Sequence, residues 1–438
     1  MYSIDWAAIL GRSRKRASDG SVPPDRAARD SWLRRISPTV WALGFTSLLT
    51  DVSSEMVASV LPMYLVLELG ISPVAFGLID GLYQGIAALV RILGGVLSDR
   101  SRRYKELAAV GYGISAACRL LILAAGAAWT TIAGVVAMDR IGKGLRTAPR
   151  DALISLRSRS EDLATAFGVH RALDAAGAFI GPVVAFLLLA RMRGAFDVLF
   201  VASFVVAVLG VAMIMLFVEP VRKDEALAAA SEPTAGLSAW ALMGHPRLRA
   251  VTVCALLLGL PTISDSFLFL SLQSNLQSAA TAFPLFYVGT SVSTALFAVP
   301  AGRAADLLGR IKVLLFGYSF LALAYVATFG PGSLWTAALC LMLLGAYYAA
   351  TDGVLTAIAA AELPSSVRGS GLAILATVTN VARLVASVVF GALWSTIGMR
   401  GATWIYFAVL IVAIGASSVL LTTAWRHTLS PNSVDISR

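Results

Sequence analysis

A series of long apolar segments, separated by short polar connections, constrains this chain more than any other feature. Each segment approaches the roughly 20 residues that an α-helix needs to cross the hydrocarbon core of a bilayer. Apolar residues run continuously within the segments and do not alternate with polar ones, which argues against a transmembrane β-barrel. The segments lie at about 39–65, 74–97, 107–127, 130–148, 163–189, 196–218, 248–272, 282–304, 311–329, 333–356, 369–394 and 402–424.

The composition agrees with a membrane protein. Hydrophobic residues make up 58% of the 438 residues and charged residues only 14%, whereas about a quarter of the residues of a soluble globular protein are charged. The sequence lacks a paired nucleophile and base, a set of four metal ligands and a phosphate-binding loop, so we expect neither an enzyme nor a cofactor. Cys118, Cys254 and Cys340 stand in separate apolar segments, as small buried side chains do.

The segments divide into two sets of six, which predicts an all-α membrane protein with twelve transmembrane helices in two six-helix bundles. The longest polar connection lies between the sixth and seventh segments, and the pattern around Asp99 recurs around Asp306, about half the chain length later. Duplicated halves of this kind are typical of secondary transporters. The expected units are a basic tail (1–38), an N-terminal bundle (39–218), a linker (219–247), a C-terminal bundle (248–424) and a second tail (425–438).

The distribution of positive charge predicts the orientation of the chain. Arginines and lysines gather in the tail and in every second connection, whereas the alternate connections hold only Arg191, Arg193 and Arg400. Because loops rich in arginine and lysine stay in the cytoplasm, we expect both termini there. This bias also explains the net charge of +10 without a nucleic-acid partner. We expect a multi-pass protein of the bacterial inner membrane or of a membrane derived from it.

Three motifs resemble signatures of the major facilitator superfamily. The stretch Gly95-Val96-Leu97-Ser98-Asp99-Arg100-Ser101-Arg102-Arg103 is similar to the family's G-x-L-x-D-R-x-G-R motif, with Arg102 in place of the second glycine. Arg140-Ile141-Gly142-Lys143-Gly144 is similar to its R-x-x-x-G motif, and Gly177-Ala178-Phe179-Ile180-Gly181-Pro182 to the G-x-x-x-G-P motif of export-type antiporters, with Ala185 and Phe186 in place of the trailing glycines. The resemblance spans residues 39 to 424 and implies the two-bundle fold of that family.

The resemblance also implies roles for single residues. Arg140 corresponds to an arginine that is linked to proton coupling, and the first motif corresponds to a gate that holds the cytoplasmic side shut. The residues expected in gating are Asp99, Arg100, Asp306, Gly181 and Pro182, the proline because it removes an amide donor and bends its helix. Thr50–Met56 and Gly142–Asp151 resemble poorly characterised bacterial permeases, some of which are associated with iron or siderophore handling, including in magnetosome membranes.

Two acids in the first segment are the main candidates for coupling. An ionisable side chain inside a membrane costs several kcal/mol unless it is paired or hydrated, so each one needs a reason. Asp51 and Glu55 lie four residues apart, on one face of a helix. Two such carboxylates resist joint ionisation, which suits them to carry a proton or to hold a metal cation. Arg140 and Asp174 are their expected partners, although permanent salt bridges to Arg140 or Arg171 would explain the acids equally.

Most of the charged residues inside the segments belong to the first half, so we expect the working chemistry there, with mainly packing and the opposing wall of the cavity in the second half. Lys143 lies on a basic stripe with Arg140, Arg146 and Arg150, which suits an anionic group; the last two could instead reach the membrane surface. We expect the substrate to be bound by Lys143, Asp80, Gln84, Arg171, Asp265, Asp352, Asn380 and Arg383.

These features predict a secondary active transporter that works by alternating access, with proton-coupled export of a small solute, such as iron or an iron chelate. One alternative is a proton symporter that imports an anionic solute or a siderophore. Another is a membrane sensor or scaffold that does not transport and whose basic N-terminal tail (1–38) binds a protein partner.

Overall fold

The computed structural model describes residues 36–159, 161–220, 246–276, 280–363 and 368–426, and these ranges contain helices and no β-strand. Most of the basic tail (1–38), the linker (219–247) and the second tail (425–438) lies outside the described residues. The N-terminal half contains α4 (Pro38–Ala58), α5 (Leu61–Met63), η1 (Tyr64–Glu68), α6 (Pro73–Ser101), α7 (Tyr104–Ala124), α8 (Trp129–Leu156), α9 (Leu163–Arg191) and α10 (Phe196–Phe217).

The C-terminal half also contains six crossings, with one crossing divided between two helices and one long helix broken at Gly398. Its elements are α13 (Pro246–Gly259), α14 (Asp265–Asn275), η2 (Ala280–Ala282), α15 (Pro284–Leu308), α16 (Arg310–Ala327), α17 (Leu334–Ala361) and α18 (Arg368–Arg426). Helix α18 contains two membrane crossings, because Gly398 has a left-handed φ of 78° and breaks the helix. The seventh crossing is divided between α13 and α14, and the first continues from α4 through α5 and η1. The chain therefore crosses the membrane twelve times, as the sequence predicts.

Eight helices within the described residues are long and apolar enough to span a membrane on those two criteria alone. The merged α18 counts once among them. The first and fourth crossings, α4 and α8, and the divided seventh crossing do not meet the criteria. These three crossings contain many of the polar side chains discussed below.

The ends of several helices follow from local sequence. Ser37 precedes Pro38, and its hydroxyl accepts a hydrogen bond from the Thr39 amide at 3.3 Å. Ser72 precedes Pro73 in the same way at the start of α6. A serine cap followed by proline is a favoured helix start, because the cap satisfies a free amide and proline has none to satisfy.

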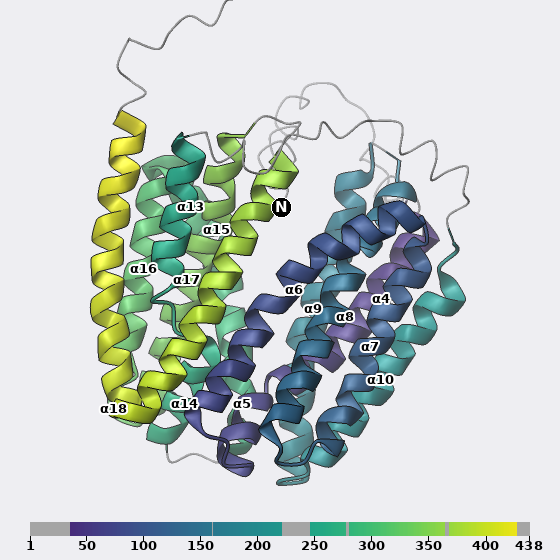
Figure 1. Cartoon of the computed structure of the whole chain (residues 1–438), viewed down its shortest axis with the longest axis horizontal. Helices are drawn as coiled ribbons and strands as arrows, with labels where there is room; N and C mark the ends of the chain where they lie inside the picture. The colour runs from purple at the N-terminus through teal and green to yellow at the C-terminus, as the bar shows by residue number, and fades with distance from the viewer. Residues whose placement is uncertain (1–35, 160, 221–245, 277–279, 364–367, 427–438) are drawn as a thin grey trace, which may run out of the picture.

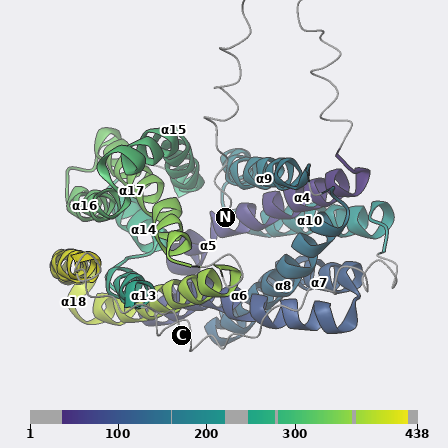
Figure 2. The same ribbon diagram turned by 90° about the horizontal axis from the view of Figure 1, so that it is seen from above.

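The two halves are packed together at one end and diverge at the other (Figure 1). We call these the lower and the upper end, as drawn in Figure 1; α4 begins and α18 ends at the upper end. Viewed from above, each half forms its own group, with α6 beside the first part of α18 and α9 beside α15 (Figure 2).

Glycines allow the backbones of α6 and α18 to approach closely at the lower end. A Cβ atom added to Gly77 would lie 2.6 Å from the Ser387 carbonyl oxygen and 3.0 Å from Cα of Gly391. A Cβ atom added to Gly81 would likewise lie 2.9 Å from the Leu384 carbonyl oxygen. Small residues at such contacts let membrane helices pack backbone to backbone. The two halves are therefore in direct contact through α6 and α18.

Candidate functional site

A cavity of about 420 Å³ lies between the two halves. This volume falls within the range of small-molecule sites. Both halves supply its wall. The lining residues with polar side chains are Glu55, Asp80, Tyr83, Gln84, Arg140, Lys143, Thr262, Ser264, Asp265, Ser266, Tyr287, Tyr348, Asn380, Arg383 and Ser387.

Aromatic rings and one buried acid close the cavity at the lower end. The ring of Phe76 packs edge-on against Phe267 with centroids 5.0 Å apart, and Phe267 also contacts Phe390 and Trp394. Beside them, the Ser387 hydroxyl donates a 2.6 Å hydrogen bond to the Asp80 carboxylate. Phe76 and Asp80 belong to the first half, whereas Phe267, its two other ring contacts and Ser387 belong to the second half. These contacts therefore join the two halves.

The interruption of the seventh crossing lies at the cavity wall. The segment from Thr262 to Ser264 separates α13 from α14 and lines the wall. The Tyr325 hydroxyl donates to the Pro261 carbonyl oxygen at 2.9 Å and accepts from the Ile263 amide at 2.8 Å. Irregular backbone inside a membrane is tolerated where it is satisfied by protein or lines a cavity, and in transporters such breaks occur at substrate sites.

Arg140 has its partners in the N-terminal half. Its guanidinium forms a very short ion pair with Asp139, and its central carbon lies 3.9 Å from the ring centroid of Tyr83. Asp139 also accepts from Arg119 at 3.0 Å, and Arg119 donates to Ser54. The described structure thus pairs Arg140 with the neighbouring Asp139, while Asp51 pairs with Arg146, and the coupling role of Arg140 stays a prediction.

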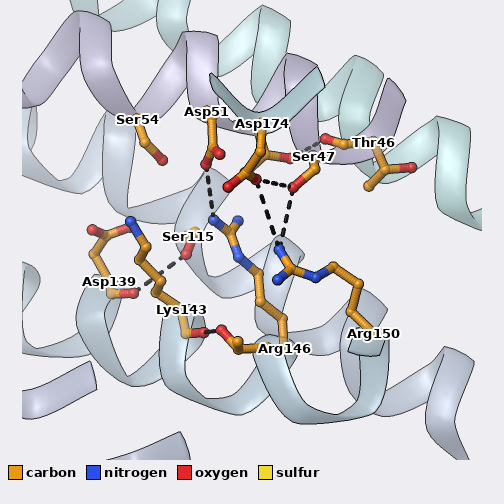
Figure 3. A network of polar contacts seen from close by, with 12 residues as sticks. Thr46, Ser47, Asp51, Ser54, Ser115, Asp139, Lys143, Arg146, Arg150 and Asp174 are labelled. Atoms are coloured by element: carbon orange, nitrogen blue, oxygen red, sulfur yellow. Dashed lines mark hydrogen bonds and ion pairs between the residues drawn. The ribbon is translucent and has the colours of Figure 1, made fainter. Parts of the chain in front are cut away.

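A second polar network joins α4, α8 and α9 (Figure 3). Arg146 forms an ion pair with Asp51 at 3.6 Å and stacks over the ring of Tyr112. Arg150 donates to the Ser47 hydroxyl at 3.2 Å and lies 3.9 Å from Asp174, which accepts a 2.6 Å hydrogen bond from Ser47.

One interpretation of the basic stripe needs correction. Neither Arg146 nor Arg150 reaches out to the membrane surface, because both are turned inward to acids; the side chain of Arg146 is only 3% exposed. The basic stripe on α8 is therefore neutralised at every position except Lys143. Asp51 and Asp174 belong to the same polar network, and neither of them lines the cavity.

Glu55 and Lys143 differ from the other charged residues of the wall. Both line the cavity, and neither side chain takes part in any ion pair or hydrogen bond among the described residues. Gly181 of α9 packs against the backbone of α4 beside Glu55, where an added Cβ would lie 2.8 Å from Cβ of Glu55. The glycine of the G-x-x-x-G-P stretch thus holds α4 and α9 close together.

The charged residues of the C-terminal wall are paired. Asp265 accepts a 2.8 Å hydrogen bond from the Tyr348 hydroxyl, and Arg383 lies 3.6 Å from Asp352 in an ion pair. Asp352 itself is more than half exposed and does not line the cavity.

The structure brings most of the expected substrate-binding residues together. Glu55, Asp80, Gln84, Arg140, Lys143, Asp265, Asn380 and Arg383 all line the cavity. Arg171 is exposed and lies outside the lining, as do Asp51, Asp174 and Asp352.

Sequence reasoning missed several polar groups of the wall, among them Tyr83, Tyr287 and Ser387. It also treated residues 248–272 as one helix and so missed Thr262 and Ser264. Pro261, two residues after Gly259, was the available signal for that break.

The expected gating residues are placed as follows. Gly181 and Pro182 are buried in α9, whose helical assignment continues through the proline. Arg100 and Asp306 are exposed at the ends of α6 and α15, and the side chain of Asp99 is outside the described part of the structure. In the described ranges no three His, Cys, Asp or Glu side chains form a group that could hold a metal ion, so Asp51 and Glu55 would have to bind a cation without a third such ligand there.

The family is established by comparison with known proteins. A family model described as Major Facilitator Superfamily matches residues 43–290 and 262–435. An uncharacterized MFS-type transporter of Methanocaldococcus jannaschii is 30% identical over 391 residues, covering 87% of this chain and 94% of the relative. An uncharacterized protein of Mycobacterium bovis is 34% identical over 157 residues, which is 36% of this chain and 38% of that protein. The chain belongs to the major facilitator superfamily, and it is a membrane transporter of that type.

Solved structures show the same fold. The nucleoside transporter NupG has a TM-score of 0.72 at 16% identity, covering 89% of this chain and 99% of that one. A POT family transporter in complex with 5-aminolevulinic acid has a TM-score of 0.70 at 15% identity, with 89% and 96% covered. At these identities the likeness concerns the fold alone.

Proposed function

We propose that this chain exports a small solute from the cytoplasm in exchange for protons. The solute and the proton compete for the carboxylate of Glu55. The observation that carries the proposal is the position of Glu55 on the cavity wall without a protein partner among the described residues. A carboxylate at this depth is costly unless it is neutralised. A proton neutralises it in one half of the cycle and a cationic group of the solute in the other, and mutual exclusion of the two is the requirement for exchange.

The charged groups around Glu55 suit this role. Lys143 and Arg140 of α8 and Tyr83 of α6 line the same cavity as Glu55. Arg140 forms an ion pair with Asp139. Its charge therefore contributes to the electrostatic potential at Glu55, but it does not neutralise Glu55 by direct pairing. Asp51 and Asp174 are proposed as a second proton site, because two carboxylates of one buried polar network resist joint ionisation.

We propose that the upper end faces the cytoplasm. The connections at that end contain Arg100, Arg102, Arg103, Arg157 and Arg310, whereas the lower connections contain Arg191, Arg193 and Arg400. This is the bias that the positive-inside rule describes. The cavity, closed at the lower end by the aromatic rings, would then be in its cytoplasm-facing state.

Transport by proteoliposomes with an imposed pH gradient tests the exchange. The probes are labelled amino acids, nucleosides, organic cations and ferric citrate, the last because the sequence resemblance includes proteins of iron handling. Exchange predicts that a transported solute accumulates in vesicles whose lumen is acidic, and that Glu55→Gln abolishes the dependence on pH.

Accumulation driven by external acid would instead support symport and uptake. Glu106→Gln is the matched control, since Glu106 is an exposed carboxylate at the start of α7. Retention of pH-driven accumulation by Glu55→Gln would contradict the role of Glu55.

A further inference from the structure

The acids and bases between α8 and its neighbours are arranged at successive levels along the membrane normal. Arg150, Arg146 and Lys143 follow one another at intervals of four and three residues, one helical turn apart on the same face of α8. Arg150 faces Asp174, and Arg146 faces Asp51. Each of the first two levels thus contains an acid and a base in an ion pair.

The third level contains Lys143 and Glu55, and here the acid and the base are left apart. Glu55 lies one turn beyond Asp51 on α4, as Lys143 lies one turn beyond Arg146 on α8. No ion pair within 4.0 Å joins them, although each side chain lies in the field of the other. This is also the level that opens into the cavity.

Every other charged side chain of the described wall makes an ion pair or a hydrogen bond within the protein. Arg140 has Asp139, Asp80 has Ser387, Asp265 has Tyr348, and Arg383 has Asp352. Among the described residues of the wall, the two that lack a partner have opposite charge. A solute with one charge would neutralise only one of them and leave the other desolvated and unpaired, which is costly.

We propose that the substrate is a small zwitterion, an amine and a carboxylate in one molecule, whose carboxylate binds Lys143 and whose ammonium group binds Glu55. The inference rests on the proposed function, because it assigns the cationic group that competes with the proton at Glu55. The rest of the molecule lies toward the rings of Tyr83, Tyr287 and Tyr348, which offer apolar faces and hydroxyl groups. Free amino acids and short peptides belong to this chemical class.

Ligand-induced thermal stabilisation of the purified full-length protein, at one pH and without a gradient, tests this assignment. The probes are matched triplets: leucine, leucinamide and 4-methylpentanoate, and phenylalanine, phenylalaninamide and 3-phenylpropionate. Dialanine and ferric citrate complete the panel. A bond to a charged group contributes about 1.5–3 kcal/mol, so removal of either charge from the ligand should weaken apparent binding roughly ten- to hundredfold.

The variants separate the two contacts. Lys143→Gln should bind the amide as well as the parent amino acid, and Glu55→Gln should bind the deaminated acid as well as the parent. Lys143→Arg and Glu55→Asp keep the charges and should retain the preference for zwitterions over singly charged analogues. These two variants show whether substitution at either position disrupts folding. Lys312→Gln and Glu106→Gln, exposed residues outside the cavity, are the matched controls.

Stabilisation by ferric citrate or by the singly charged analogues equal to that by the zwitterions would overturn the proposal, as would no stabilisation by any zwitterion of the panel. Because the assay needs no proton gradient, these outcomes are independent of pH-driven exchange. A protein that prefers zwitterions but shows no dependence on the pH gradient would refute the proposed coupling and keep the substrate class.

Discussion

Single residues explain how so many charges are accommodated inside this membrane protein. Asp139 lies between Arg119 and Arg140, Asp51 opposite Arg146, and Asp174 beside Arg150. The sequence shows which of these side chains are buried but not which ones meet, because pairing depends on the rotation and depth of separate helices. The ion pair between Arg140 and Asp139 was missed for that reason, although the two residues are adjacent on one helix.

Arg102 provides a prediction about stability at the residue scale. It is the one non-glycine residue with positive φ in the described ranges, at φ 56°, and it ends α6 where the family pattern has glycine. A left-handed conformation costs a residue with a Cβ about 1–2 kcal/mol, which glycine avoids in part. Arg102→Gly should raise the free energy of unfolding by up to about 1 kcal/mol, measured by thermal unfolding in detergent.

The neighbouring residue is a suitable control for that measurement. Arg103 has an ordinary φ of −104°, so Arg103→Gly should leave stability unchanged or lower it through the added freedom of the unfolded chain. Equal gains for both substitutions would show that loss of positive charge, not backbone conformation, is responsible.

At the scale of elements, the number and order of the crossings were predictable from hydropathy, whereas their interruptions were not. The apolar segments were long enough to count, and the connections contained the expected polar residues. The break between α13 and α14 was missed because apolar residues continue across it, so hydropathy does not change there. Its structure depends on Tyr325, which comes from a different helix and gives no local signal near Pro261.

Tyr325→Phe should weaken this break. The substitution removes the hydroxyl that satisfies the Pro261 carbonyl and the Ile263 amide, and each backbone group left unpaired costs about 1–3 kcal/mol. We expect a lower melting temperature and reduced substrate affinity, because Thr262 and Ser264 of the cavity wall lose their support.

Tyr64→Phe is the control, since the ring of Tyr64 packs against Phe196 and Phe200 and its hydroxyl makes no hydrogen bond that the described structure records. If Tyr325→Phe melts and binds as the parent protein does, the hydroxyl has no structural role at the break.

At the scale of the whole molecule, the two halves are joined by α6 and α18 at the lower end, with a cavity above the contact. The duplicated halves could be predicted from the repeated motif around Asp99 and Asp306. The cavity could be predicted only in part, because it also depends on residues such as Tyr83 and Ser387, whose sequence context resembles that of ordinary packing positions.

Gly77→Ala should shift the equilibrium between the two orientations of the cavity. The added Cβ would meet the Ser387 carbonyl oxygen at 2.6 Å, closer than such atoms approach, so the lower contact must loosen. A cysteine introduced at Ala58, on the cavity wall, reports this: we expect faster labelling by a membrane-impermeant maleimide from the lower side of the membrane. The native cysteines are buried and should react slowly.

Gly134→Ala is the control for this substitution, because nothing lies within 4 Å of the Cβ that it adds. Equal labelling of the Gly77→Ala and Gly134→Ala proteins from the lower side would mean that the contact between α6 and α18 does not limit opening.

The hydrogen bond from Ser387 to Asp80 has a consequence for the speed of turnover. When the lower end opens, the carboxylate exchanges the serine hydroxyl for water, and such exchanges change the overall free energy little. The hydrogen bond joins the two halves, however, so it must break before α6 and α18 can separate, and we expect this step to slow the opening. Replacing Ser387 would accordingly change how fast the carrier reorients more than which orientation it prefers at rest.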